Sequence, residues 1–237
     1  MLYNKAKYIQ GEIILIGYYN YTVVLTYCSL VSGVLGIMVS LSDMGHPFLG
    51  GFFLLVCGLC DAFDGKVART KQGRSDSEKK FGIQIDSLSD LVAFGVLPAS
   101  IGAAMFRRLS LINDKLPKTY TILIFAVVAF YVLAAMIRLA YFNVLEEERQ
   151  SKEGGNLKSY IGLPVTSASI IFPFVLLIHY ILPADITPIY FAVMLFVGAL
   201  FVSRIKVAKP GLRGILIMVG IGAAEFAALL VFKLFSK

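Results

Sequence analysis

Two short stretches, DAFDGKVAR at Asp61–Arg69 and GIQIDSLSD at Gly82–Asp90, place four aspartates in a chain that is 58% hydrophobic. Apolar residues precede the first stretch and follow the second, so both stretches are expected to lie on helices. The aspartates are three residues apart in the first stretch and four apart in the second. Each pair therefore shares one helical face. If the two faces pack together, four carboxylates meet in a small volume.

Carboxylates at membrane depth are costly and usually functional. The four concerned here are Asp61, Asp64, Asp86 and Asp90. Oxygen ligands favour magnesium, manganese or calcium over zinc. Four carboxylates can hold two such ions, which is an arrangement suited to phosphoryl chemistry. The alternative is a set of helix-end charges solvated at the membrane interface, where charge is tolerated but this spacing is not required.

The composition is that of a membrane protein. The chain has 237 residues, a mean hydropathy of +0.79 and only 16% charged residues. Its net charge of +7 suits anionic membrane lipids and phosphorylated substrates. Nucleic acid is excluded as a partner, because no soluble module is present to offer a basic face. Cys57 and Cys60 form a CxxC inside an apolar segment, and we interpret them as small core residues, not as a zinc or redox pair.

The expected fold is an all-α integral membrane bundle of about six or seven transmembrane helices around a polar active-site cavity. We expect one membrane domain over 1–237, with an interfacial N-terminal segment at 1–17, a catalytic core at 18–206 and an additional C-terminal helix at 207–237. The apolar segments long enough to span are 18–41, 47–65, 83–106, 119–145, 163–182, 187–203 and 212–235.

The basic residues indicate the orientation. With the N-terminus in the cytoplasm, fifteen Lys and Arg residues fall on the inside and six on the outside. This bias predicts that the cavity faces the cytoplasm of a multi-pass protein in the cell membrane.

The pattern D-x-x-D-G-x-x-A-R followed by G-x-x-x-D-x-x-x-D resembles the signature of the CDP-alcohol phosphatidyltransferases. Its fixed positions here are Asp61, Asp64, Gly65, Ala68, Arg69, Gly82, Asp86 and Asp90. The resemblance implies a membrane enzyme that uses two divalent metals to exchange CMP on a CDP-linked lipid for an alcohol. The segment between the two halves, 70–81, is longer than in the family signature and is expected to lengthen a cytoplasmic loop without moving the helices.

Further stretches are similar to the phosphatidylserine synthase branch of that family. They are DSLSDLVAFGVLPA at 86–99, RLAYFN at 138–143, YIGLPVT at 160–166 and FVSRIK at 201–206. The resemblance implies CDP-diacylglycerol and L-serine as substrates, CMP as a product, membrane lipids as surroundings and a homodimer. Glycerol 3-phosphate or inositol phosphate as acceptor, and a diether CDP-lipid as donor, stay open. A cation transporter is a distant alternative. Transporters are often built from two repeated halves, and the sequence shows no such repeat.

The resemblance also implies the roles of individual residues. Asp61, Asp64, Asp86 and Asp90 would hold two ions of Mg²⁺ or Mn²⁺, and Asp90 would also be the catalytic base. The candidate substrate-binding residues are Asp61, Gly65, Ala68, Arg69, Gly82, Thr22, Lys66, Arg138, Arg204 and Lys206. Thr22 could instead bond its own helix backbone, and Arg138 could instead make a structural pair. The sequence leaves open which of Arg138, Arg204 and Lys206 receives the serine carboxylate.

Overall fold

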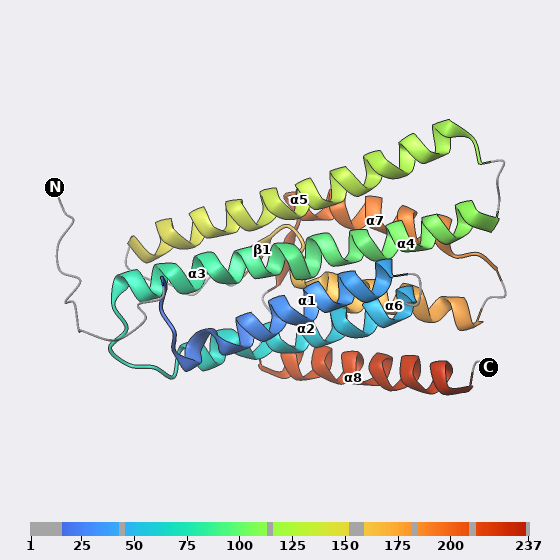
Figure 1. Cartoon of the computed structure of the whole chain (residues 1–237). Coiled ribbons are helices and arrows are strands. Elements are labelled where there is room, and N and C mark those ends of the chain that lie inside the picture. The colour runs from blue at the N-terminus through green and yellow to red at the C-terminus, as the bar shows by residue number, and fades with distance from the viewer. Residues whose placement is uncertain are drawn as a thin grey trace.

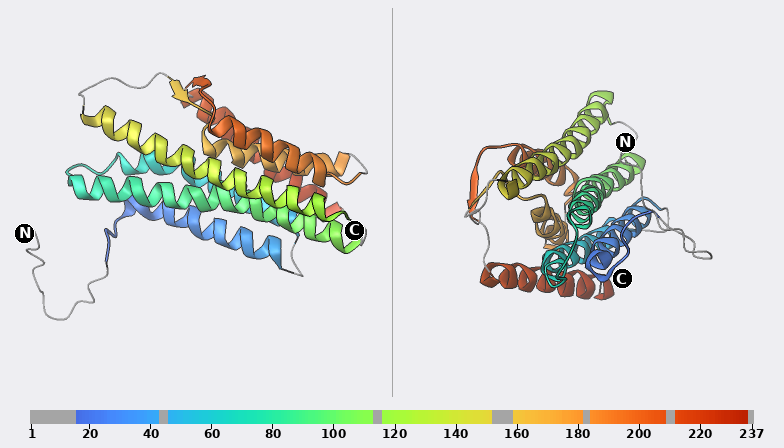
Figure 2. Two further views of the ribbon diagram at one scale, coloured as in Figure 1. Left: turned by 90° about the horizontal axis from the view of Figure 1, so that it is seen from above. Right: turned by 90° about the vertical axis from the view of Figure 1, so that its left-hand side faces the viewer.

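The computed structural model describes residues 16–42, 46–112, 116–151, 159–181, 184–208 and 212–235. The described chain is a bundle of helices (Figure 1). In order, the elements are η1 (Tyr21–Val23), α1 (Val24–Leu41), α2 (Pro47–Ala68), α3 (Asp76–Asp90), η2 (Leu91–Val96), α4 (Leu97–Ile112), α5 (Lys118–Ser151), β1 (Ser159–Ile161), η3 (Val165–Ser167), α6 (Ala168–Ile181), α7 (Thr187–Phe201), β2 (Lys206–Ala208) and α8 (Leu212–Phe235). Figure 2 shows α8 lying at an oblique angle to the other helices.

The helical membrane architecture expected from the sequence is confirmed. Four helical stretches among the described residues are long and apolar enough to cross a membrane: Tyr21–Leu41, Pro47–Ala68, Asp76–Leu111 and Lys118–Glu148. The expectation of seven full-length spans is met only in part. The helices α6 and α7 have 14 and 15 residues, whereas about 20 are needed to cross the hydrocarbon region without help.

The helices α3 and α4 form one long rod through the π-helical segment η2. Pro98 lies just after η2 and has no N–H, so the carbonyl of Phe94, four residues earlier, loses its usual α-helical donor. The Tyr131 hydroxyl on α5 donates to this carbonyl at 2.7 Å. A side chain of a neighbouring helix thus supplies the missing donor, and the rod continues past the proline.

Aromatic side chains fill the core between this rod, α5, α6 and α7. Tyr131 and Tyr190 are fully buried, and the Tyr190 hydroxyl donates to the Pro98 carbonyl at 2.9 Å. The Tyr131 ring meets the Phe172 ring edge-on, with their centroids 5.5 Å apart. Close van der Waals packing of such large side chains helps to hold these helices together.

The segment between the two aspartate stretches differs from the expected loop. The helix α2 continues to Ala68, beyond the predicted end at 65, and α3 begins at Asp76, before the predicted start at 83. The prediction that 70–81 only lengthens a loop was therefore wrong for its second half. Ser75 and Glu78 form a capping box that starts α3 early, since each side chain accepts a hydrogen bond from the other's backbone N–H.

Two short strands were not expected from the sequence. The strand β1 pairs with β2 in antiparallel register, with Tyr160 opposite Val207. Gly162, next to β1, has a φ of +78°, a conformation that glycine adopts without strain. Its N–H donates to the Ile205 carbonyl at 2.7 Å. Most of the expected interfacial segment 1–17 lies outside the described residues.

Candidate metal and substrate site

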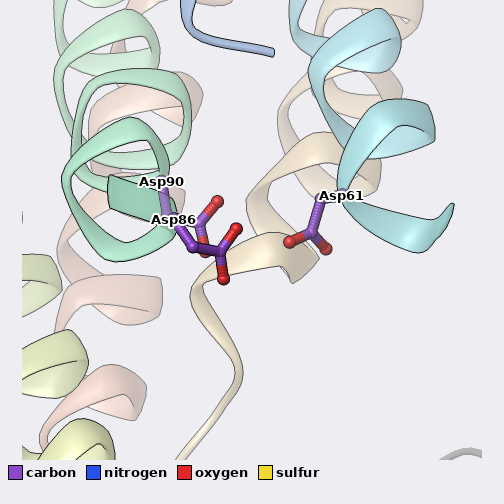
Figure 3. Close-up of side chains that lie close together, drawn as sticks. All are labelled: Asp61, Asp86 and Asp90. Carbon is purple, nitrogen blue, oxygen red and sulfur yellow. The ribbon is translucent and has the colours of Figure 1, made fainter. Parts of the chain in front are cut away.

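Three of the four predicted aspartates converge. Asp61 lies in the last two turns of α2, and Asp86 and Asp90 lie one turn apart at the end of α3. One carboxylate oxygen from each lies within 4.8 Å of those of the other two. Figure 3 shows the Asp61 carboxylate directed from α2 toward the pair on α3. The two aspartate-bearing stretches therefore do face each other, and three of their four carboxylates form one group.

The fourth aspartate lies at the edge of this cluster. Asp64 is buried on α2, shares a side-chain hydrogen bond with Asp86 and lies within electrostatic reach of Asp61. Three residues advance an α-helix by about 300°, so Asp64 is turned about 60° away from Asp61 around the axis of α2. The structure thus brings Asp61, Asp86 and Asp90 into one group, and Asp64 joins it at the edge through Asp86.

This group fits a divalent cation. Three carboxylates this close repel one another, and a bound cation offsets that repulsion. Their oxygens are hard ligands of the kind that Mg²⁺ and Mn²⁺ prefer, and zinc would favour the nitrogen and sulfur ligands absent from the group. The buried aspartate cluster could therefore bind a metal.

A cavity of about 770 Å³ adjoins the aspartates. Asp61, Asp86 and Asp90 form part of its wall, and Arg138 on α5 forms another part. The segment from Leu163 to Ile170 contributes three hydroxyl side chains, namely Thr166, Ser167 and Ser169. The cavity thus presents carboxylates, one guanidinium and several hydroxyls to a bound molecule.

Arg138 is 6% exposed and is held in place by its surroundings. Its Nε donates to the Leu163 carbonyl at 3.2 Å, and its guanidinium lies 5.4 Å from the Phe142 ring centroid. The sequence left the role of Arg138 open, and the structure places its side chain in the wall of the same cavity as the aspartates. A guanidinium here can receive a carboxylate or a phosphate.

The other predicted cations lie elsewhere. Lys66 lies over the Phe63 ring, 5.3 Å from its centroid. Arg204 and Lys206 are exposed and are not part of the cavity wall. Thr22 is buried, and its hydroxyl and backbone N–H both donate to the Asn20 side chain. The acceptor is thus a neighbouring side chain and not the helix backbone carbonyl that the alternative named.

Arg69 belongs to a second, cationic cavity of about 410 Å³. Its wall consists of Ala68, Arg69, Lys71, Gly73, Arg74 and Lys79. The signature glycines adjoin these arginines. A Cβ on Gly65 would lie 3.7 Å from Arg69 Nη1, and a Cβ on Gly82 would lie 2.8 Å from Arg74 Nη2. Gly82 therefore admits the Arg74 guanidinium, a contact that the sequence did not suggest.

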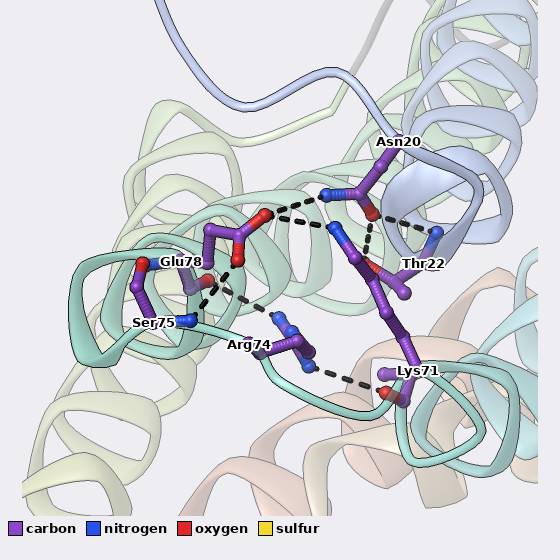
Figure 4. A network of polar contacts seen from close by, with 7 residues as sticks. Asn20, Thr22, Lys71, Arg74, Ser75 and Glu78 are labelled. Carbon is purple, nitrogen blue, oxygen red and sulfur yellow. Dashed lines mark hydrogen bonds and ion pairs between the residues drawn. The ribbon is translucent and has the colours of Figure 1, made fainter.

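The loop before α3 is held by a network around Glu78 (Figure 4). The Glu78 carboxylate accepts from Lys71 Nζ at 2.9 Å, from Asn20 Nδ2 at 3.3 Å and from the Ser75 N–H at 3.1 Å. Arg74 donates to the backbone carbonyls of Ala68 and Glu78. The network ties the end of α2 to the start of α3 and so helps to fix the two helices that carry the aspartates.

Sequence reasoning missed two groups of residues near the site. The hydroxyls of Thr166, Ser167 and Ser169 line the cavity. Asn143 on α5 exchanges hydrogen bonds of 2.8 and 3.1 Å with Ser87, which lies next to Asp86. Both groups fall within or beside the stretches 138–143 and 160–166. The sequence thus carried a signal at these positions, but no feature of it showed which side chains face the site.

Comparisons with known proteins agree with this geometry. The family profile described as CDP-alcohol phosphatidyltransferase matches residues 19–205. A CDP-diacylglycerol–serine O-phosphatidyltransferase of Methanocaldococcus jannaschii is 30% identical over 186 residues, which cover 78% of this chain and 71% of that protein. One from Helicobacter pylori is 29% identical over 180 residues, which cover 73% of this chain and 66% of that protein. An archaetidylserine synthase of Methanothermobacter thermautotrophicus is 34% identical over 142 residues, which cover 59% of this chain and 50% of that protein.

Proposed function

The chain belongs to the CDP-alcohol phosphatidyltransferase family, and from that premise we propose that it transfers the phosphatidyl group of CDP-diacylglycerol to L-serine. The products are phosphatidylserine and CMP. One observation carries the proposal: three clustered aspartates and a buried arginine line the same cavity. The aspartates suit a metal-bound diphosphate, and the arginine suits an acceptor that carries its own negative charge.

Serine as the acceptor is supported by the relatives. Those from M. jannaschii and H. pylori are described as serine O-phosphatidyltransferases. The archaetidylserine synthase is at least as similar over a shorter stretch, so a diether CDP-lipid is the second candidate for the donor. Glycerol 3-phosphate and inositol phosphate are the alternative acceptors.

In the proposed mechanism the serine hydroxyl displaces CMP at the lipid-side phosphorus. Asp90 accepts the proton of that hydroxyl, because an alcohol is a weak nucleophile at neutral pH without a base in reach. Asp61, Asp86 and Asp90 would hold one divalent ion, Mg²⁺ or Mn²⁺, and Asp64 would help to hold a second. When bound, such ions supply charge stabilisation for the diphosphate and for the departing CMP.

The Arg138 guanidinium is the proposed partner of the serine carboxylate. Its hydrogen bond to the Leu163 carbonyl and its contact with the Phe142 ring fix its direction before substrate arrives, which lowers the entropic cost of binding. Arg69 and Lys66 are not part of the wall of the cavity beside the aspartates. They would contact the nucleotide part of the CDP-linked lipid, together with Gly65, Ala68 and Gly82. We place the aspartate end of the bundle on the cytoplasmic side, from the distribution of basic residues, and expect a homodimer.

The test is metal-dependent CMP release by the purified chain. CDP-diacylglycerol and Mn²⁺ are supplied with L-serine, glycerol 3-phosphate or inositol phosphate in parallel, and each reaction is repeated with a CDP-linked diether lipid. The proposal predicts release with serine and none with the other acceptors. Release with another acceptor would keep the metal site and overturn the serine assignment. Absence of release in every reaction would overturn the proposed activity.

A further inference from the structure

The cavity beside the aspartates is much more apolar than the proposed reaction requires. Beyond the aspartates, Arg138 and the three hydroxyls, its wall is formed by hydrocarbon. The apolar lining comes from α2, α5, the 163–170 segment, β2 and α8, and includes Leu55, Val56, Leu59, Leu139, Phe226 and Val207. Serine, a diphosphate and metal ions all require polar surroundings, so none of them accounts for this part of the wall.

The helix α8 closes this apolar part, although it lies outside the family match at 19–205. Gly222, Ala223 and Phe226 of α8 line the cavity. The Phe226 ring packs against Phe52 of α2, with their centroids 4.0 Å apart. The helix α8 lies at an oblique angle to the bundle (Figure 2), and its part of the cavity wall spans little more than one helical turn.

We propose that α8 and α2 together form the wall of a subsite for one hydrocarbon chain of the CDP-linked lipid. The inference rests on the proposed function and adds to it a site on a helix that the family match does not include. The aspartates fix the diphosphate at one end of the cavity, and the lipid chain must leave that point through apolar surroundings. The lining from Leu59 and Leu55 to Phe226 offers such a path.

Gly222 sets the width of this path. A Cβ at Gly222 would lie 3.6 Å from Leu55 Cδ2, an ordinary contact, so the backbone of α8 approaches α2 to within about one side-chain layer. A longer side chain at this position would extend into the space that the lipid chain occupies. Gly220, two residues earlier, is exposed, and a Cβ there would meet no atom within 4 Å.

The matched variants Gly222→Leu and Gly220→Leu test the proposal, because they add the same side chain to the same helix on different faces. The probe is CDP-diacylglycerol with a diazirine near the end of one acyl chain, bound to the full-length protein in lipid nanodiscs with Mn²⁺. Photolysis followed by mass spectrometry identifies the labelled residues, and excess unlabelled CDP-diacylglycerol or phosphatidylcholine is added as competitor. This readout requires binding but no turnover, so it stays interpretable if the serine assignment fails.

We expect the wild-type protein to be labelled on α8 and on the facing residues of α2, and unlabelled CDP-diacylglycerol but not phosphatidylcholine to suppress the label. Gly222→Leu should reduce that label several-fold, and Gly220→Leu should leave it unchanged. In the CMP-release assay, Gly222→Leu should raise KM for a long-chain donor more than for a dioctanoyl donor. Labelling that both lipids suppress equally, or equal effects of the two variants, would overturn the proposal. If Gly222→Leu does not fold, the competition result in the wild-type protein decides alone.

Discussion

The Nε of Arg138 donates to the carbonyl of Leu163 at 3.2 Å, and the N–H of Leu163 in turn donates to the carbonyl of Leu200 at the end of α7. The cation of the cavity is thus anchored to a segment that is itself anchored to a distant helix. Gly162 makes this connection possible. A Cβ there would lie 2.8 Å from the Phe201 carbonyl oxygen, in addition to the strain of a positive φ.

We therefore expect Gly162→Ala to destabilise the protein and to reduce its activity. The positive φ costs about 1–2 kcal/mol for a residue with a Cβ, and the steric overlap adds roughly 1–3 kcal/mol. Gly73→Ala is the matched control, since Gly73 has a φ of +69° and no atom within 4 Å of the added Cβ. Thermal unfolding in detergent should show a larger drop in Tm for Gly162→Ala. Equal drops in Tm would mean that the close approach of residue 162 to the end of α7 does not contribute to the loss of stability.

Removing the charge of Arg138 should weaken serine binding selectively. A charge-assisted hydrogen bond contributes roughly 1.5–3 kcal/mol, so Arg138→Gln should raise KM for serine by about tenfold to a hundredfold. The KM for serine of Arg138→Lys should lie between those of Arg138→Gln and the wild type, because lysine keeps the positive charge but lacks the paired N–H donors of the guanidinium. KM for the CDP-lipid should change less. Lys206→Gln, at an exposed residue outside the cavity, is the control. A similar rise in KM for serine in Lys206→Gln would contradict the assignment of Arg138 as the partner of the serine carboxylate.

Asp90→Asn should lower kcat by about a hundredfold or more, because general bases typically contribute factors of this size. Asparagine keeps the shape and one oxygen ligand but cannot take up the proton. Titration with Mn²⁺ must accompany the kinetics, so that the rate is measured with the metal sites filled. Near-normal turnover at saturating Mn²⁺ would assign the base to another residue.

The two aspartates of α2 should differ in their effect on metal binding. Asp61 belongs to the cluster within 4.8 Å, and Asp64 lies beside it. Asp61→Asn should therefore weaken binding at the tighter site, whereas Asp64→Asn should leave one Mn²⁺ bound per chain. Electron paramagnetic resonance of free Mn²⁺ gives both the stoichiometry and the affinity. The opposite order, with the tighter ion lost in Asp64→Asn, would contradict the arrangement inferred from the cluster.

The spacing of the aspartates was enough to place each pair on one helical face, because the α-helical period is regular. That the two faces meet depends on the packing of α2 against α3, which the spacing does not determine. Arg138 was identified as a candidate, but its anchor could not be predicted. Leu163 lies 25 residues further along, and its position depends on two three-residue strands and a glycine turn. Such short elements have no periodic pattern to read. The early start of α3 was readable from Ser75 and Glu78, but the polar composition of 70–81 favoured a loop.

Tyr131→Phe should destabilise the protein more than Tyr190→Phe. The Tyr131 hydroxyl donates to the Phe94 carbonyl, whose α-helical donor is missing because Pro98 has no N–H. The Tyr190 hydroxyl donates to the Pro98 carbonyl, which still has the N–H of Gly102 four residues ahead in α4. A buried carbonyl that loses its partner costs roughly 1–3 kcal/mol, whereas a redundant bond contributes about 1 kcal/mol or less.

Both tyrosines are fully buried aromatic residues, so the two variants remove the same atom from similar surroundings. Thermal unfolding in detergent should show the larger drop in Tm for Tyr131→Phe. Proteolysis or hydrogen exchange should locate the added opening near η2, directly after Asp90. Equal or reversed effects would show that the π-helical segment satisfies the Phe94 carbonyl by itself, and that the rod carrying Asp86 and Asp90 does not depend on α5 for its continuity.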